Sequence, residues 1–108
     1  MNSVFEELAN LDRLIHEPAR LAVLTALSSC QKTDFLFLQR LTGLSAGNLS
    51  AHLSKLEEAH LVKTEKTIVA KKTKTHVFIT GQGQEEINEY WQKIESLRSG
   101  AEKWQSEE

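Results

Sequence analysis

Apolar residues recur at helical spacing in the first third of the chain. In residues 3–15 they stand three and four positions apart, which predicts a helix with a single apolar stripe. Ser3 and Glu6 have the spacing of a capping box at its start. Pro18 suits the first turn of a second helix over residues 18–27, where its missing N–H costs nothing. That second helix is apolar nearly all round, which indicates a central core helix.

Two shorter helices with a glycine between them follow. Either Thr33 or Asp34 is expected to cap the first, and Gly43 suits the left-handed residue that ends it. Ser45 is expected to cap the next helix, over residues 45–58. Inward-facing apolar positions are predicted on the first of these helices at Phe35, Leu38 and Leu41. On the second helix the inward stripe is predicted at Leu49, Leu53 and Leu56.

The pattern then changes from helical spacing to the alternation of a β-hairpin. Residues 62–69 are rich in β-branched side chains and residues 75–80 alternate, so the basic connection at 70–74 is predicted to be the hairpin tip. A last helix is expected over about 82–104, after Gly81 and Gly83. Its apolar stripe is too long for one small domain to cover, which usually marks an interface. The stripe consists of Ile87, Tyr90, Trp91, Ile94, Leu97, Ala101 and Trp104.

Size and composition fit one globular domain spanning residues 1–108, with 40% hydrophobic and 26% charged residues. The formal net charge of −2 hides an uneven distribution. Residues 62–78 hold five lysines against one glutamate, whereas residues 82–108 hold seven acids against three bases. The chain therefore combines a basic hairpin with an acidic C-terminal segment, and composition alone favours a solvated charged loop and a solvated helix.

Several locations and functions are disfavoured. No segment is apolar enough to span a bilayer, and the acidic N-terminus lacks an apolar signal core, so a cytoplasmic protein is expected. Cys30 is the only cysteine, which leaves no disulfide and no thiolate metal cluster. No nucleophile motif, phosphate loop or plausible catalytic carboxylate pair is present. We therefore expect neither an enzyme nor a bound cofactor.

The order of helix, glycine turn, capped helix and basic hairpin predicts a winged helix-turn-helix. Three motifs resemble the ArsR/MarR superfamily of transcriptional regulators, above all its short stand-alone members: HEPARLAVL at 16–24, LTGLS at 41–45 and NLSAHLSKLEEAHLV at 48–62. The resemblance covers roughly residues 11–97. Family members usually have glycine where His60 stands in this chain.

The resemblance implies a mainly α fold of about five helices with a β-hairpin wing. The helix-turn-helix is expected at about 34–59 and the wing at about 62–80. Family members that sense metals use sets including His or Cys on the last helix, which has neither here, so no metal site is expected. The family also implies a homodimer through the N- and C-terminal helices, with candidate interface residues Phe5, Leu8, Ile87, Trp91, Ile94, Leu97 and Trp104.

A protein of this kind places the second helix of the motif in the major groove of duplex DNA. Asn48 suits a bidentate contact with adenine, and Lys55 suits guanine or a phosphate. The candidate contact residues on this recognition helix are Ser45, Gly47, Asn48, Ser50, Ala51, Ser54 and Lys55. Arg40 on the preceding helix and the hairpin lysines Lys71, Lys72 and Lys74 are candidates for the phosphate backbone or the minor groove.

Other interpretations stay open. The same scaffold can act as a protein–protein interaction module without DNA binding, in which the polar helix face and the basic loop are solvated surface. An unknown small-molecule effector is a third possibility, in a pocket lined by Tyr90 and Trp91, but core or dimer packing is the favoured role of these two residues.

Two polar residues beside the apolar stripes are assigned structural roles. Arg20 is expected to pair with a carboxylate, either Glu17 or Asp12, rather than with DNA. His52 borders the apolar stripe of the recognition helix, which favours a half-buried, hydrogen-bonded histidine over a base contact.

Overall fold

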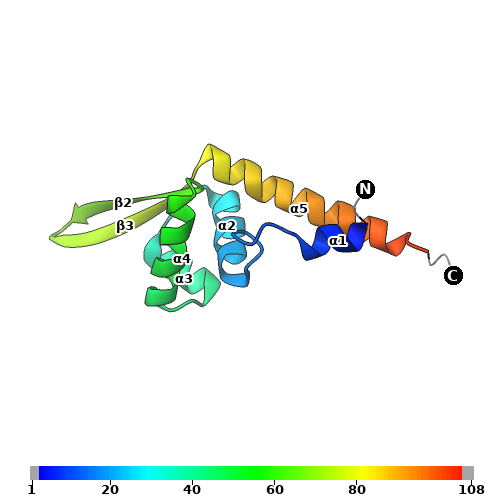
Figure 1. Ribbon diagram of the computed structural model, residues 1–108. Helices are drawn as coiled ribbons and strands as arrows, with labels where there is room; N and C mark the ends of the chain where they lie inside the picture. The colour runs from blue at the N-terminus through cyan, green and yellow to red at the C-terminus, as the bar shows by residue number, and fades with distance from the viewer. Residues whose placement is uncertain (1–2, 106–108) are drawn as a thin grey trace.

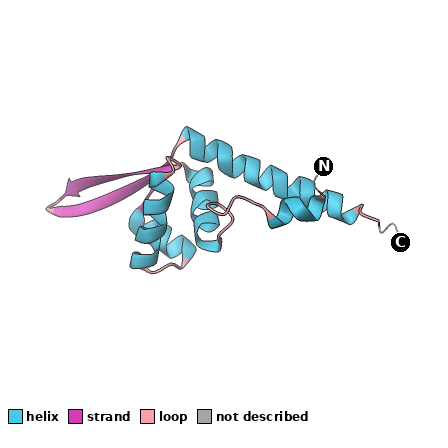
Figure 2. Ribbon diagram, in the orientation of Figure 1, coloured by secondary structure: helices cyan, strands magenta, loops and turns pink. Residues whose placement is uncertain are grey.

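The computed structural model describes residues 3–105 as an elongated molecule of 69 × 25 × 21 Å. A helical body carries a hairpin at one end, and a long helix extends from the other with the first helix against its far part (Figures 1 and 2). The elements are α1 (Val4–Ala9), α2 (Pro18–Cys30), β1 (Lys32–Asp34), α3 (Phe35–Thr42), α4 (Ala46–Glu58), β2 (Val62–Val69), β3 (Lys72–Ile79) and α5 (Gly81–Glu102). The winged helix-turn-helix that the sequence predicts is therefore confirmed.

Helix α1 starts as predicted but is shorter. The Ser3 hydroxyl accepts from the Glu6 amide and the Glu6 carboxylate accepts from the Ser3 amide, which confirms the capping box. The longer predicted helix is wrong, because α1 ends after six residues. The Asn10 side chain donates to the Glu6 carbonyl, and Asp12 accepts from the amide two residues later, both at 2.8 Å. Such local bonds compete with the helix, and residues 10–17 form a non-helical segment, which we call the strap.

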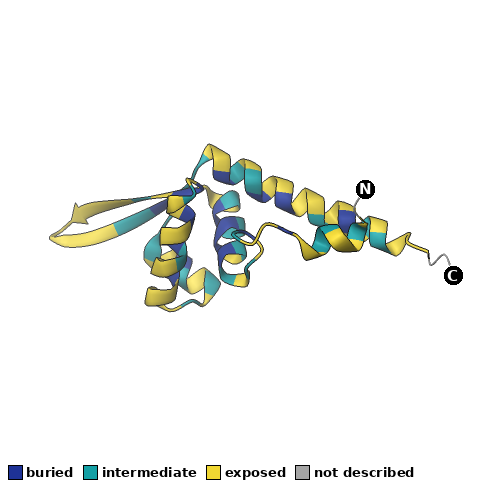
Figure 3. Ribbon diagram, in the orientation of Figure 1, coloured by how far each residue is buried: buried dark blue, intermediate teal, exposed yellow. Residues whose placement is uncertain are grey.

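Helices α2, α3 and α4 form the body. The predicted Pro18 start of α2, the Ser45 cap of α4 and the left-handed Gly43 at φ 71° are confirmed. Of the two candidate caps of α3, Thr33 and Asp34, the structure shows Asp34. One inward position is wrong, since Leu41 is 55% exposed and only Leu38 of α3 is fully buried. Figure 3 shows the buried residues gathered where the body meets the root of the hairpin and the inner side of α5.

The three strands form one antiparallel sheet in the order β1-β3-β2. Strand β1 was not predicted, because its three residues carry no alternation and gain strand structure by pairing with β3. The predicted 70–74 tip is wrong in extent: the turn is Ala70 and Lys71, both at positive φ, and β3 already begins at Lys72. A turn of two such residues matches the twist of a hairpin.

The junction between α4 and β2 contains a residue in the left-handed region. His60 has a φ of 63°, a conformation that favours glycine, the residue that the resembled family usually has at this position. Thr80 closes the junction by donating from its hydroxyl to the His60 carbonyl at 2.7 Å, and it also caps α5. The root of the wing and the start of α5 are thus joined at one point.

Candidate nucleic-acid interface

Helix α4 presents a face of small and polar side chains. The Ser45 hydroxyl accepts from the Asn48 amide at 3.2 Å and caps the helix. One side of the helix is anchored in the core through Leu49, Leu53 and Leu56, so the opposite side faces solvent. All seven residues that the sequence proposes for DNA contact on this helix are exposed: Ser45, Gly47, Asn48, Ser50, Ala51, Ser54 and Lys55.

A groove runs between α4 and the wing. Its lining consists of Phe35, Ser50, Leu53, Ser54, Glu57, Thr64, Lys66 and Thr75, and we call it the helix–wing groove. The Glu57 carboxylate accepts from both the amide and the hydroxyl of Thr64, at 2.9 and 3.0 Å. These two hydrogen bonds join the base of the wing to α4. They therefore restrict how far the two sides of the groove can move relative to each other.

The register of the hairpin assigns each wing lysine to a face. Alternation places Lys66 on the same face as Thr64, toward α4. Lys72 and Lys74 lie on the opposite face, and Lys74 approaches the Asp34 carboxylate at 3.8 Å. Lys71 stands in the turn itself. Of the three lysines proposed from the sequence, only Lys71 is therefore at the tip. The lysine inside the helix–wing groove is Lys66, which was not among the candidate contact residues.

Arg40 lies on α3, away from the wing. It is exposed and borders an open hollow with Leu36, Gln39, Gly43 and Leu44 at the turn between α3 and α4. The recognition helix begins directly after this turn, so Arg40 stands beside its N-terminal end. This placement suits a contact with the phosphate backbone next to a groove.

Replacing Glu57 separates its two effects on DNA binding. We expect Glu57→Gln to bind duplex DNA more tightly than the parent chain, because it removes a negative charge from the groove but keeps an acceptor for Thr64. Glu57→Ala removes the same charge and also the tether, at a cost of about 1 kcal/mol in unfolding free energy, so it should bind more weakly than Glu57→Gln. Fluorescence anisotropy and urea unfolding measure both effects; equal DNA affinity of the two variants would contradict the tether.

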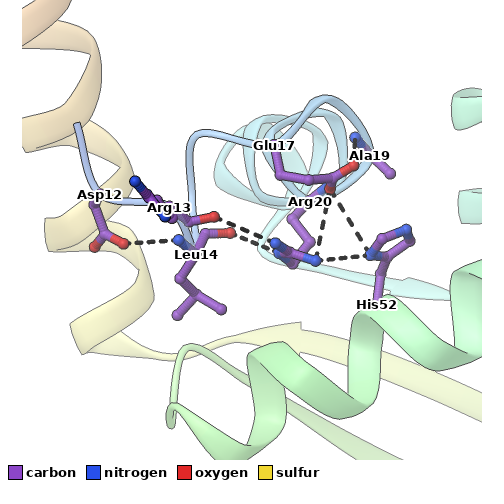
Figure 4. Close-up of polar contacts among 7 residues, drawn as sticks. All are labelled: Asp12, Arg13, Leu14, Glu17, Ala19, Arg20 and His52. Atoms are coloured by element: carbon purple, nitrogen blue, oxygen red, sulfur yellow. Dashed lines mark hydrogen bonds and ion pairs between the residues drawn. The ribbon is translucent and has the colours of Figure 1, made fainter. Parts of the chain in front are cut away.

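A second polar contact holds the other border of α4. His52 Nδ1 lies 3.1 Å from Nη1 of Arg20, which is buried at 8% exposure. The predicted pairing of Arg20 with Glu17 is confirmed at 3.8 Å, and His52 is half-buried as predicted. Figure 4 shows the same guanidinium reaching the strap carbonyls of Leu14 and Arg13.

Glu17 completes this cluster as the cap of α2. Its carboxylate accepts from the Arg20 amide at 2.8 Å and the Ala19 amide at 3.2 Å. Desolvation raises the pKa of Glu17, but these two backbone bonds and the charge of Arg20 outweigh it and hold the pKa below its ordinary value. The carboxylate therefore stays ionised near neutral pH, where it stabilises the start of α2.

The residues proposed for a dimer interface fall into two groups. Ile87 and Leu97 are buried within the chain, and Leu8 and Ile94 are half-buried. Exposed apolar surface remains at Phe5, Trp91 and Trp104, with 42–57% exposure. Phe5 and Trp104 form an edge-to-face pair 5.5 Å apart between α1 and the C-terminal end of α5. The accessible part of the proposed interface thus consists of Phe5 on α1, Trp91 within α5 and Trp104 just after it.

The pocket proposed for an effector differs from expectation. Tyr90 lines an open hollow between the strap and α5, with Leu11, Asp12, Ile15, Glu86, Glu89 and Lys93. Trp91 lies outside it and donates to the Thr25 hydroxyl at 3.2 Å. Within residues 3–105 no group of three or more His, Cys, Asp or Glu side chains is arranged to hold a metal ion. In the same part of the chain no helix has the length and hydropathy to cross a bilayer.

Comparison with known proteins agrees with this geometry. Residues 19–97 match the family of winged helix DNA-binding domains. An uncharacterized protein of Methanocaldococcus jannaschii is 30% identical over 90 residues, which cover 83% of this chain and 98% of that protein. The structure of a transcriptional regulator homologue from Pyrococcus horikoshii aligns with a TM-score of 0.82 and 30% identity, over 91% of this chain and 96% of that one.

A structure solved with DNA is also similar. Overoxidized AbfR bound to DNA aligns with a TM-score of 0.63 and 25% identity, over 70% of this chain and 55% of that chain. The predicted resemblance to winged-helix regulators is confirmed, and the matched family is one of DNA-binding domains rather than of enzymes. The chain belongs to the winged helix DNA-binding domain family.

Proposed function

We propose that this protein is a sequence-specific regulator of transcription that binds duplex DNA as a homodimer. One observation carries the proposal: the exposed face of α4 and the lysine-bearing wing form the two walls of a single groove. Winged-helix proteins of similar structure include AbfR, which was solved bound to DNA. A helix of this kind fits the major groove, which is wide enough to admit it.

The recognition helix reads bases with few hydrogen bonds. Asn48 donates to and accepts from adenine, and Lys55 donates to guanine or to a phosphate. Gly47 and Ala51 have no polar side chain, so they allow close approach and contact with thymine methyl groups. Because direct base contacts are sparse, sequence-dependent DNA shape supplies part of the specificity.

The backbone contacts come from both sides of this helix. Arg40 binds a phosphate beside the N-terminal end of α4, and Lys66 and Lys71 bind phosphates along the wing. Lys72 and Lys74 extend the positive surface on the far face of the hairpin, where Lys74 shares its charge with Asp34. Each neutralised phosphate lowers the log of affinity by about 0.9 per tenfold rise in salt.

The arm formed by α1 and α5 supplies the dimer contact. Three large aromatic side chains are exposed there, which is unusual for a surface in contact with water only. Pairing two arms covers Phe5, Trp91 and Trp104 and sets two recognition helices for half-sites about 34 Å apart. Such a dimer selects a pseudo-palindromic operator because its two halves are related by a twofold axis.

Selection of bound duplexes from a random pool tests the proposal. We expect the selected duplex to bind about 10³-fold or more tightly than a scrambled duplex of the same length at physiological salt. Equal affinity for the two duplexes would remove the sequence-specific part of the proposal. Absence of binding at low salt would favour the protein–protein interaction module that the scaffold also permits.

A further inference from the structure

Helix α4 is fixed by polar contacts on both borders of its buried stripe. At 100° per residue, His52 and Glu57 lie on opposite sides of the buried leucines. Glu57 is bonded to Thr64 of the wing, and His52 is bonded to Arg20 of α2. The three buried leucines already fix which side of α4 faces the core. The two border contacts are directional hydrogen bonds and add to the restraint on rotation of α4.

The Arg20 side chain is buried and hydrogen-bonded within the protein, unlike a charged side chain on the surface. Within residues 3–105 it is the only buried charged residue. Its Nε donates to the Leu14 carbonyl at 2.6 Å, and its Nη2 donates to the Arg13 carbonyl at 3.3 Å. The third direction of the guanidinium, Nη1, points at His52 (Figure 4). A single rigid group therefore joins the strap to the recognition helix.

The strap is in turn fixed to α5. His16 Nδ1 lies 2.7 Å from the hydroxyl of Tyr90, which is itself buried at 7% exposure. The strap consequently touches the long helix through His16 and the recognition helix through Arg20. The orientation of α4 is set relative to α5 by this chain of contacts as well as by the core.

We infer that Arg20 is a positioning residue for DNA reading, acting through His52 to hold α4 at the rotation that presents Asn48 and Ala51 to the major groove of bound DNA. The inference rests on the proposed function, since it concerns how that function's recognition helix is aligned. Residues that read a ligand do so only if neighbouring residues hold their side chains within a fraction of an ångström of the binding geometry. Arg20 supplies that support from a buried position that DNA does not contact.

Two groups face Nδ1 of His52: Nη1 of Arg20 at 3.1 Å and the Glu17 carboxylate at 3.8 Å. The guanidinium is the closer of the two and has only donors, so Nδ1 should accept from it and the ring proton should lie on Nε2. Nitrogen-15 NMR of the imidazole in the DNA-free protein reads this tautomer directly. We expect the Nε2–H form; a protonated Nδ1 would overturn the inference whether or not DNA binds.

Two substitutions at His52 test positioning without disturbing the buried guanidinium. His52→Leu keeps apolar bulk but removes the acceptor, and Arg20 retains Glu17 and the strap carbonyls. His52→Asn places a polar atom at the same branch position as Nδ1 and restores an acceptor. Residual dipolar couplings of backbone N–H groups should show α4 reoriented relative to α2 and α5 in His52→Leu and unchanged in His52→Asn. Unchanged couplings in both variants would overturn the inference.

The DNA-binding readout separates positioning from direct contact. Under conditions where both variants are folded, His52→Leu should bind the selected duplex about tenfold more weakly, as expected for losing a hydrogen bond to a charged group. The log–log salt slope should not change, whereas loss of a phosphate contact would make it less negative by about 0.9. A less negative slope, or no rescue by His52→Asn, would contradict the positioning role. If the parent chain selects no duplex, the proposed function fails, while the α4 orientation still decides the inference.

Discussion

Reversing the charges of Lys66 and Lys71 is expected to lower affinity for duplex DNA by about 100-fold or more for each chain bound. Each lysine is proposed to make a charge-assisted contact with a phosphate, worth about 1.5 kcal/mol or more, and about 3 kcal/mol corresponds to two decades in affinity. The log–log salt slope should become less negative by about 1.8 for each chain bound, because two phosphate contacts are lost. Anisotropy titrations across a salt series measure both quantities.

The matched control carries the same change in net charge at a distant place. Lys93→Glu with Lys103→Glu alters two exposed lysines of α5 and its C-terminal end, far from the groove. Because both lie on the proposed dimer arm, light scattering must show that this control keeps the parental oligomeric state. We expect this control to keep the parental salt slope and most of the affinity. If the control weakened binding as much as the Lys66 and Lys71 pair, DNA binding would follow overall charge and not a localised wing contact.

Replacing Gly83 with alanine is expected to destabilise the fold by about 3 kcal/mol or more. A Cβ built on Gly83 would lie 2.1 Å from the Leu61 carbonyl oxygen and 3.0 Å from a side-chain carbon of Ile79. The Leu61 carbonyl already accepts from the amide and hydroxyl of Thr80, at 3.0 and 3.1 Å. Relief of the clash therefore requires the start of α5 to move away from the root of the wing.

Urea unfolding of Gly83→Ala and Gly81→Ala measures this effect in a matched pair. Both residues are in the first turn of α5, but a Cβ on Gly81 meets nothing within 4 Å. Gly81→Ala should be neutral or stabilising by up to about 1 kcal/mol, as the helix propensities predict. Similar stability of the two variants would show that the close approach at Leu61 is not maintained in solution.

Local sequence signals are sufficient to predict the recognition helix and its buried side. A serine cap and three leucines at helical spacing predicted α4 and its buried side, and both depend on residues within one helix. Gly43, and a cap of α3 at Thr33 or Asp34, are predicted for the same reason. The outward face of α4 followed directly, and with it the candidate contact residues.

Features that depend on tertiary pairing were not predicted. Strand β1 exists only because three residues pair with β3, and the two faces of the wing depend on a register fixed by a two-residue turn. Lys66 was consequently omitted from the site, although alternation from a correctly placed turn would have indicated it. The Arg20–His52 contact joins residues that are 32 positions apart in the sequence, and no local sequence pattern predicts a contact over that separation.

Major-groove interference on the selected duplex tests the central claim most directly. Replacing single purines with 7-deazapurines removes the N7 acceptor from the major groove without affecting base pairing. We predict that such replacements weaken binding in two segments whose centres lie about 10 base pairs apart, one for each α4 of a dimer. We also predict that Asn48→Ala abolishes the sensitivity of one adenine in each segment. Insensitivity at every position would contradict the placement of α4 in the major groove, and a single sensitive segment would contradict the dimer.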